Sequence, residues 1–231
     1  MTWVVIPAAG RGARFGGELP KQYVPLFGRT VLHHTMDRLS RHPEVSGLMV
    51  VLAAQDPHWP GWREMNGRKV LTAIGGAERA ASVLAGLQAL PAEVRERDWV
   101  LVHDAARPCL RRSDLTRLLD HGQAHSVGAL LAAPVRDTLK RADRRGEVGA
   151  TEPRKNLWRA LTPQLFKRGT LTRALEAAMA AGTALTDESM AIERFGLRPL
   201  LVEGAEDNLK ITTPVDLAVA EFVLGRLSPE E

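Results

Sequence analysis

The sequence contains very little cysteine and no long apolar run. Cys109 is the single cysteine among 231 residues, so no disulfide can form within the chain, which suits a reducing compartment. No stretch approaches the ~20 apolar residues that span a membrane. The first residues lack the basic and apolar regions of a signal peptide. We therefore expect a cytoplasmic protein that has no membrane partner.

Aromatic residues and long basic runs are also scarce. Aromatics make up 5% of the chain, and 31 Lys and Arg residues are dispersed among 27 Asp and Glu residues, for a net charge of +4 at pH 7. A nucleic-acid-binding protein more often combines a basic stripe with interleaved aromatics. We therefore expect no nucleic-acid partner, although a non-catalytic module that binds nucleotides or nucleic acid stays an open alternative.

The composition fits a single domain over residues 1–231, with 45% hydrophobic and 25% charged residues. Short β-rich runs alternate with helical patterns, which is typical of an α/β domain with a mainly parallel sheet. The expected strands are residues 3–6, 48–52, 70–73, 99–102, 129–133 and 200–202. The expected helices are residues 30–40, 78–90, 113–122 and 170–181, with two more that start near 186 and at 213.

Residues 134–156 interrupt this alternation. The stretch is charged, contains Gly146, Gly149 and Pro153, and has no helical period. We interpret it as an excursion from the main sheet, in the form of a β-arm.

Capping residues predict where two of the helices begin and where one of them ends. Ser113 is a good N-cap residue, and Gly122 fits the C′ position of the same helix. Thr213 is the expected N-cap of the last helix, with Pro214 at its first position.

The loop after the first strand lacks the G-x-x-x-x-G-K-[ST] motif of P-loop proteins, yet it suits phosphate groups. It reads Pro7-Ala8-Ala9-Gly10-Arg11-Gly12-Ala13-Arg14-Phe15-Gly16, and Lys21 follows. Small residues let backbone N–H groups approach anionic oxygens, while Arg14 and Lys21 add positive charge. Its third glycine falls one place too late for a dinucleotide fingerprint, so a dehydrogenase is disfavoured. We predict a triphosphate site rather than a glycine-rich turn with surface arginines.

A second glycine pair, Gly75-Gly76, ends the expected strand at residues 70–73. Arg79 and Ser82 follow on the first turn of a helix, three residues apart, and therefore project from the same side. They can complete a nucleotide pocket, or the segment can be an ordinary turn and helix start. The residues alone do not decide between these interpretations.

Asp104 follows a buried strand at residues 99–102. A carboxylate at that position suits Mg²⁺, which is commonly held by one or two carboxylates and by substrate phosphates. Arg107 is close enough in sequence to serve the same anion, whereas the neighbouring His103 is interpreted as structural. Asp104 as a cap of the next loop is the simpler alternative. No Ser-His-Asp or Cys-His arrangement is evident.

Further polar groups are expected on loops, namely Thr138, Thr162, residues 186–188 and residues 207–212. Each of them alone is more often a cap or a turn than part of a site.

Together, these motifs resemble the 2-C-methyl-D-erythritol 4-phosphate cytidylyltransferase family. The matching elements, in family order, are Pro7-Ala8-Ala9-Gly10 with Gly12 and Arg14, Pro20-Lys21-Gln22-Tyr23, Gly75-Gly76 with Arg79, Ser82 and Val83, Val102-His103-Asp104-Ala105-Ala106-Arg107-Pro108, Ala133-Pro134-Val135-Arg136-Asp137-Thr138, Leu157-Trp158 with Leu161-Thr162-Pro163-Gln164, Thr186-Asp187-Glu188 and Asp207-Asn208-Leu209-Lys210. Each element alone is weak, but the ordered set spans nearly the whole chain and is highly specific.

The resemblance implies a Rossmann-like nucleotidyltransferase α/β fold, with a mainly parallel twisted sheet flanked by helices and a protruding β-arm. It also implies a homodimer joined by the arm at residues 134–156. The implied reaction joins CTP to 2-C-methyl-D-erythritol 4-phosphate with Mg²⁺, and gives 4-diphosphocytidyl-2-C-methyl-D-erythritol and pyrophosphate for isoprenoid synthesis.

The resemblance further implies residue roles, carried over by position. Substrate-binding residues would be Ala8, Ala9, Gly10, Gly12, Gly76, Arg79, Ser82, Asp104, Ala105, Arg107, Thr138, Thr162 and Thr186. Catalytic cations would be Arg14, Lys21, Arg154 and Lys210, with Asp104 as the metal ligand. Arg154 and Lys210 would also hold the second substrate, and Thr138 and Arg154 could reach a neighbouring subunit's site. Two departures matter: Ala77 replaces an Asp of some relatives, and Lys155 could be the arm cation instead of Arg154.

The residue types agree with this chemistry. A phosphate nucleophile with a second pKa of about 6 is already ionised at neutral pH, so no general base is required. The protein must bring two anions together and stabilise charge at the α-phosphate. A cytidylyltransferase for another polyol phosphate, such as ribitol 5-phosphate, is the close alternative. The residues that would discriminate are Thr162 to Gln164 and Thr186.

Overall fold

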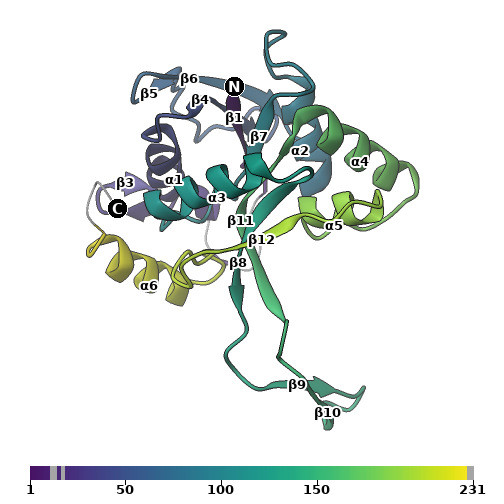
Figure 1. Ribbon diagram of the computed structural model, residues 1–231. Helices are drawn as coiled ribbons and strands as arrows, with labels where there is room; N and C mark the ends of the chain where they lie inside the picture. Colours follow the sequence, from purple (N-terminus) through teal and green to yellow (C-terminus); the bar gives the residue numbers. More distant parts are fainter. Residues whose placement is uncertain (11–14, 17–18, 228–231) are drawn as a thin grey trace.

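The chain folds around one mixed sheet of eight strands, in the order β12-β8-β11-β7-β1-β4-β6-β5 (Figure 1). The structure is a computed structural model that describes residues 1–10, 15–16 and 19–227. The strands of this sheet are β1 (Thr2–Pro7), β4 (Val45–Leu52), β5 (Glu64–Met65), β6 (Arg68–Ile74), β7 (Trp99–Val102), β8 (Gly128–Pro134), β11 (Trp158–Lys167) and β12 (Leu200–Glu203). A short hairpin, β2 (Pro25–Leu26) with β3 (Arg29–Thr30), lies apart from it.

Most neighbouring strands are parallel, as predicted. β1 pairs in parallel with both β4 and β7, β4 with β6, and β8 with β12. The α/β fold with a mainly parallel sheet is therefore confirmed. β11 is the main exception, because it runs antiparallel between β7 and β8. The sequence did not predict this strand, because Thr162, Pro163 and Gln164 interrupt its apolar residues.

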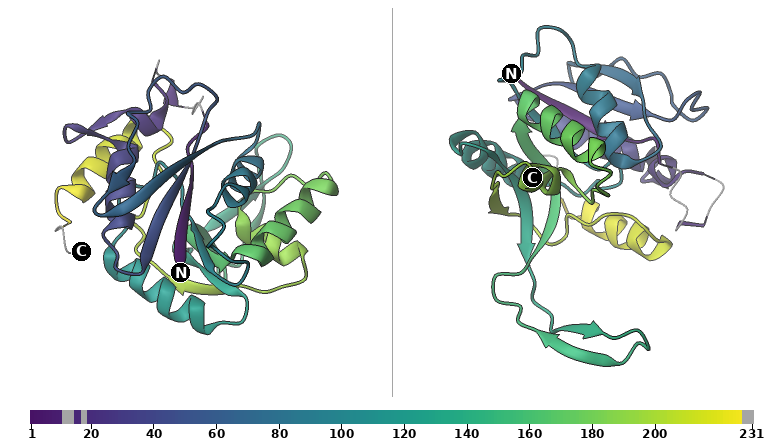
Figure 2. Two further views of the ribbon diagram at one scale, coloured as in Figure 1. Left: turned by 90° about the horizontal axis from the view of Figure 1, so that it is seen from above. Right: turned by 90° about the vertical axis from the view of Figure 1, so that its right-hand side faces the viewer.

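Helices cover both faces of the sheet (Figure 2). They are α1 (Val31–Ser40), α2 (Arg79–Gln88), α3 (Arg112–Ala124), α4 (Arg168–Ala180), α5 (Glu188–Arg194) and α6 (Pro214–Leu224), with a 3-10 turn, η2, at Lys21–Tyr23. Side chains of β1 alternate between two cores: Val4 and Ile6 join the core that includes α1 and α3, and Val5 joins that of α2, α4 and α5. A strand buried on both faces explains its unbroken apolar run.

Two predicted helix ends have different outcomes. α6 begins as expected, with Thr213 as its N-cap and Pro214 in its first turn. For α3 the predicted caps are wrong: Arg111 is the N-cap, and Gly122 lies inside the helix. Gly122 is needed there for packing, since a Cβ would lie 2.8 Å from Leu165 Cδ2 of β11. The glycine thus lets α3 approach the sheet closely.

The predicted β-arm is present between β8 and β11. It carries the antiparallel pair β9 (Leu139–Ala142) and β10 (Val148–Glu152) and projects from the body of the molecule (Figure 1). Most of its residues are exposed. The single-domain organisation and a dimerisation role of the arm stay predictions. In the part of the chain that is described, no helix is both long and apolar enough to cross a membrane.

Candidate active site

A pocket opens where β1, β6 and β7 end, at the edge of the sheet where open α/β folds bind ligands. Parallel strands bring the loops after them to one edge, so the small-residue loop meets the segments that begin at Gly76 and Asp104. The lining residues are Pro7, Ala8, Ala9, Gly10, Lys21, Gln22, Gly76, Ala77, Glu78, Arg79, Ser82, Asp104, Ala105, Ala106 and Lys210.

The structure therefore brings together many of the predicted site residues. Those that line the pocket are Ala8, Ala9, Gly10, Lys21, Gly76, Arg79, Ser82, Asp104, Ala105 and Lys210. Gly12 and Arg14 lie outside the described residues. Arg107 and Thr162 lie next to the pocket, where both contact Asp104. Thr138, Thr186 and Arg154 are exposed elsewhere on the chain.

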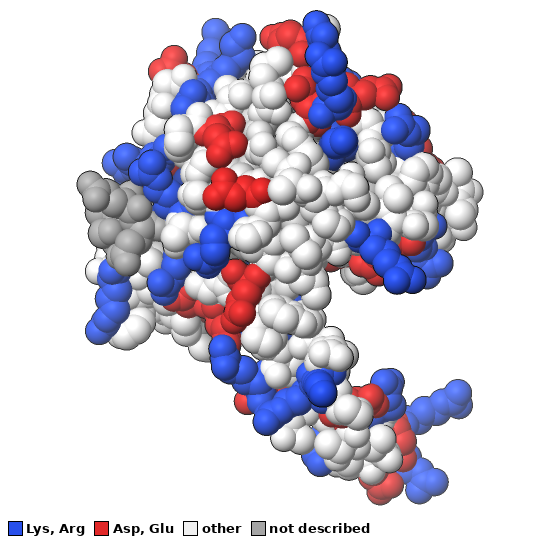
Figure 3. All heavy atoms as spheres, viewed as in Figure 1, with Lys and Arg blue, Asp and Glu red and all other residues white. Residues whose placement is uncertain are grey.

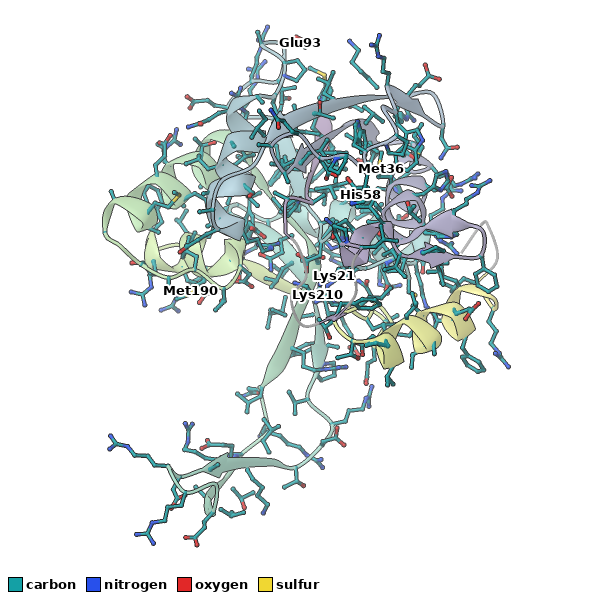
Figure 4. All side chains as sticks on the ribbon, turned by 180° about the vertical axis from the view of Figure 1, so that it is seen from behind. Lys21, Met36, His58, Glu93, Met190 and Lys210 are labelled. Atoms are coloured by element: carbon teal, nitrogen blue, oxygen red, sulfur yellow. The ribbon has the colours of Figure 1, made fainter. Side chains whose placement is uncertain are left out.

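Hydrogen bonds of Lys21 and of its neighbour Gln22 hold Lys21 at the pocket. Its Nζ donates a hydrogen bond to the carbonyl oxygen of Ile211 at 2.9 Å. The next residue, Gln22, is buried and donates through Nε2 to the carbonyls of Ala8 (2.7 Å) and Gly10 (3.0 Å). Gln22 thus fastens the first strand's loop to η2, a role that the sequence did not reveal. Lys21 and Lys210 lie close together near the root of the arm (Figure 4).

Asp104 is the electrostatic centre of the pocket. Its Oδ1 accepts from Arg79 Nε at 3.0 Å, and its Oδ2 lies 3.0 Å from Lys210 Nζ and 3.3 Å from Arg107 Nε. Burial alone would raise the pKa of this carboxyl, but Arg79, then Lys210 and Arg107, hold the pKa far below its ordinary value. Asp104 is therefore a permanent anion that gathers three cations at one point.

Thr162 stands directly behind Asp104. It was predicted on a loop, and this is wrong: Thr162 is buried on β11. Its Oγ1 accepts from the backbone N–H of Asp104 at 3.2 Å and lies 2.9 Å from His103 Nδ1. The strand was missed because Pro163 lies within it, at a shift of register between Ala160 and Gln164.

The hydroxyl group of Thr162 donates its proton to a hydrogen bond within the protein, to His103. His103 Nε2 lies 3.1 Å from the carbonyl oxygen of Arg107, which can only accept, so Nε2 carries the proton and Nδ1 accepts from Thr162. Burial lowers the pKa of His103 to about 4, which keeps the ring neutral. His103 is structural, as predicted, and Thr162 fixes the backbone of Asp104.

The segment that carries Lys210 is tied to the same strand. Asn208 is fully buried, and its Nδ2 donates to the carbonyl oxygen of Thr162 at 2.8 Å. Its own carbonyl oxygen accepts from Arg107 Nη1 at 2.7 Å. These bonds bring Lys210 to Asp104, although the two residues are far apart in sequence.

Arg79 and Glu188 form the other buried ion pair at this site. Arg79 Nη1 and Nη2 reach the two carboxylate oxygens of Glu188 at 2.5 and 3.1 Å. Glu188 begins α5, at the end of the predicted Thr186-Asp187-Glu188 motif, but the sequence suggested only a helix N-terminus for it. Ser82 uses its Oγ within α2, where it donates to the carbonyl of Glu78 at 3.1 Å.

The donor set limits what kind of metal site is feasible. Among the described residues, no group of three or more His, Cys, Asp or Glu side chains is placed to hold a metal. Asp104 faces the pocket, but both of its oxygens have cationic partners. Glu78 and Asp104 are the carboxylate residues among the described residues that line the pocket, and Mg²⁺ is commonly held by one or two carboxylates together with substrate phosphates.

The arrangement defines a class of protein. Its mainly parallel sheet, its loop of small residues and its cations around a buried carboxylate are those of an α/β nucleotidyltransferase. The described residues that line the pocket include no histidine or cysteine.

Comparison with known proteins gives the family. Residues 2–226 match the family described as IspD, 2-C-methyl-D-erythritol 4-phosphate cytidylyltransferase. This chain belongs to that family.

Curated relatives and solved structures agree with this assignment. The 2-C-methyl-D-erythritol 4-phosphate cytidylyltransferase of Stenotrophomonas maltophilia (strain R551-3) is 64% identical over 224 residues, which is 97% of this chain and 97% of the relative. The enzyme of that name from Francisella tularensis has a crystal structure with a TM-score of 0.81 and 34% identity, covering 96% of this chain and 99% of that one. The crystal structure of the enzyme of that name from Thermus thermophilus has a TM-score of 0.76 and 32% identity, covering 97% of this chain and 98% of that one.

Proposed function

We propose that this chain transfers the cytidylyl group of CTP to 2-C-methyl-D-erythritol 4-phosphate, and that the pocket around Asp104 is where the transfer occurs. Family membership over residues 2–226 carries the overall reaction. The observation that supports the location is the cluster of Arg79, Arg107 and Lys210 on one buried carboxylate, beside the loop at Ala8 to Gly10.

The reaction needs positioned cations more than a base. A phosphate oxygen of the alcohol phosphate attacks the α-phosphorus of CTP, a new P–O bond forms, and the bond to the β-phosphate oxygen breaks to release pyrophosphate. The nucleophile is already ionised, because the second phosphate pKa is about 6. Lys21 lines the pocket, where it would stabilise the added charge at the α-phosphate, and we assign Arg14 the same task.

The remaining pocket residues divide between the two substrates. The backbone from Ala8 to Gly10, together with Gly76 and Ser82, would hold the nucleotide. Lys210, which lines the pocket, and Arg107, which lies next to it, would bind the second phosphate. We assign Thr186 to the same substrate, although it does not line this pocket. Bound Mg²⁺ would neutralise charge on the triphosphate, and Asp104, which lines the pocket, would hold it. We also propose a cytoplasmic location, since a chain whose single cysteine is Cys109 forms no disulfide within itself, which suits a reducing compartment.

Pyrophosphate release tests this function. Wild-type protein with CTP and Mg²⁺ is expected to release pyrophosphate with 2-C-methyl-D-erythritol 4-phosphate and not without an alcohol phosphate. Ribitol 5-phosphate, assayed at the same concentration, separates the proposed reaction from the alternative one. A higher kcat/KM with ribitol 5-phosphate would contradict the substrate assignment. No release with any polyol phosphate would favour a non-catalytic module.

We further propose that the chain forms a homodimer through residues 134–156, and that the arm completes a site of the partner. Two observations support this. Thr138 and Arg154 are exposed on the arm and do not line the pocket of their own chain, while the Arg154 guanidinium donates to the carbonyl oxygen of Arg136. Lys and Arg side chains are frequent on the arm, where Asp and Glu side chains lie among them (Figure 3).

A mixing experiment tests whether the arm acts between subunits. Arg154→Ala and Lys21→Ala proteins are expected to be weakly active alone, because each lacks a cation of the site. After equal amounts are allowed to exchange subunits, about half of the dimers are mixed and each has one intact site, so about a quarter of wild-type activity returns. Sedimentation measures the dimer, and pyrophosphate release measures the recovery.

Lys155→Ala serves as the matched variant in this experiment. If Arg154 is the arm cation, Lys155→Ala keeps near wild-type activity alone. If Lys155→Ala is the weak variant instead, Lys155 is the arm cation. Unchanged low activity in a mixture that has exchanged subunits would show that the arm serves its own chain.

A further inference from the structure

Glu188 is a buried carboxylate at the edge of the pocket, and the proposed reaction gives it no role. Its side chain is 1% exposed, and it does not line the pocket. Both of its oxygens face the guanidinium of Arg79, with Nη1 at 2.5 Å and Nη2 at 3.1 Å. Any effect of Glu188 on the substrates must therefore pass through Arg79.

Arg79 lies between two carboxylates. Its Nε donates to Asp104 Oδ1 at 3.0 Å while its terminal nitrogens bind Glu188. A guanidinium is a rigid planar fork, so two carboxylates on different edges determine its orientation. With Asp104 as its only partner, the guanidinium could turn about that contact toward the triphosphate.

The backbone around Glu188 is itself firmly held. Asp187 accepts from the backbone N–H of Met190 at 3.0 Å and from Gln164 Nε2 at 2.9 Å. The amide oxygen of Gln164 accepts from the backbone N–H of Ser189 at 2.8 Å. Gln164 lies on β11, two residues after Thr162, which binds the backbone of Asp104. Glu188 is thus anchored to the strand that supports Asp104.

These contacts connect the two halves of the pocket. Residues 186–189 belong to the side that we assign to the alcohol phosphate, whereas Arg79 and Ser82 begin the helix on the nucleotide side. Glu188 and Arg79 are 109 positions apart in sequence, and their ion pair is the direct side-chain link between α5 and the start of α2 that the described contacts show.

We propose that Glu188 is a positioning residue: it holds Arg79 against Asp104 and away from the triphosphate, and so couples residues 186–189 to the nucleotide pocket. This inference rests on the proposed function. The consequence is that loss of Glu188 lowers turnover without weakening the binding of CTP. Without the Glu188 charge, Arg79 gains an anionic partner in CTP or pyrophosphate, so nucleotide binding is kept or strengthened while the reacting groups lose their alignment.

A double-mutant cycle tests the proposal, with Glu188→Gln, Arg79→Gln and the double variant. We expect Glu188→Gln to lower kcat at least about tenfold, since small misplacements of reacting groups have large effects on rate. Its dissociation constant for CTP, measured by calorimetry, should stay equal or fall. The double variant should lose no more kcat than Arg79→Gln alone, because Glu188 acts through Arg79.

A conservative variant and a remote pair complete the design. Glu188→Asp keeps the charge and should recover part of the lost kcat; if Glu188→Gln does not fold, Glu188→Asp takes its place in the cycle. Asp37→Asn is the matched control, since Asp37 makes a two-bond pair with Arg41 at 2.8 and 3.0 Å and does not line the pocket. Its kcat should stay within about threefold of wild type.

Two results would overturn the proposal. The first is a kcat of Glu188→Gln within about threefold of wild type. The second is a pair of kcat losses that multiply in the double variant, which would mean that Glu188 does not act through Arg79. Failure of the wild-type protein to release pyrophosphate would instead contradict the proposed function, so the two failures are distinguishable.

Discussion

Lys21→Met is expected to lower kcat at least about 100-fold, while the dissociation constant for CTP changes less than about tenfold. Lys21 lines the pocket and is directed there by its 2.9 Å bond to the carbonyl oxygen of Ile211. The triphosphate is already charged before the reaction, but the α-phosphate gains its additional charge only as the second phosphate attacks. A cation aimed at that point therefore contributes more to the transition state than to substrate binding.

Three comparisons make this prediction specific. Lys21→Arg keeps the charge and should retain more turnover than Lys21→Met. Lys69→Met removes an equally charged but exposed side chain on β6 and should leave kcat unchanged. Arg14→Ala is expected to resemble Lys21→Met, although Arg14 lies outside the described residues. Wild-type kcat in Lys21→Met, or a loss that appears only in CTP affinity, would contradict the assigned role.

The strands that the sequence predicted are those whose apolar pattern is local. Residues 99–102 were predicted and form β7 with the same bounds, because four consecutive apolar residues suit a strand covered on both faces. β11 was not predicted. Its buried residues 161–166 include Thr162, Pro163 and Gln164, which are polar or poor strand formers. Their burial comes from β7 and β8 on either side, and no local pattern encodes it.

A similar division applies to the pocket. Lys21, Asp104 and Lys210 could be singled out because each follows or adjoins a recognisable motif near a strand end. The sequence could not show which of these residues form hydrogen bonds with one another. Gln22 binds the carbonyls of the loop that precedes it, and His103 meets Thr162 across 59 positions. Because such bonds depend on how the loops fold over one edge, residue types alone do not predict them.

The charge balance of the pocket explains why its acids matter as much as its cations. Arg79, Arg107 and Lys210 repel one another when they are brought together, and Asp104 is the anion that all three contact. With Asp104 in place, the cations stay organised before substrate arrives, so little reorganisation is needed during the reaction. Removal of this carboxylate should therefore affect both folding and turnover.

Asp104→Asn is expected to lower kcat at least about 100-fold and the free energy of unfolding by about 3–5 kcal/mol. An amide has one acceptor oxygen and directs its NH₂ group at a cation, so at least one of the present ion pairs becomes a contact between donors. Pyrophosphate release and denaturant unfolding measure the two effects. Asp114→Asn is the matched control, since Asp114 is also buried and pairs with Arg117, but does not line the pocket. It should lose stability with kcat nearly unchanged.

The pH dependence of stability distinguishes the effect of the Asp104 charge from the effect of its packing. The pKa of this carboxyl is lowered in the folded protein from an ordinary value near 3.8, so the unfolded chain binds the proton more readily. Its contribution to stability is therefore complete above that value and is lost as the pH falls below it. Asp104→Asn has no such group to titrate, so the stability gap between the two proteins should be constant near neutral pH and narrow below about pH 4. A gap that stays the same at pH 3 would mean that the loss comes from altered packing instead of the missing charge.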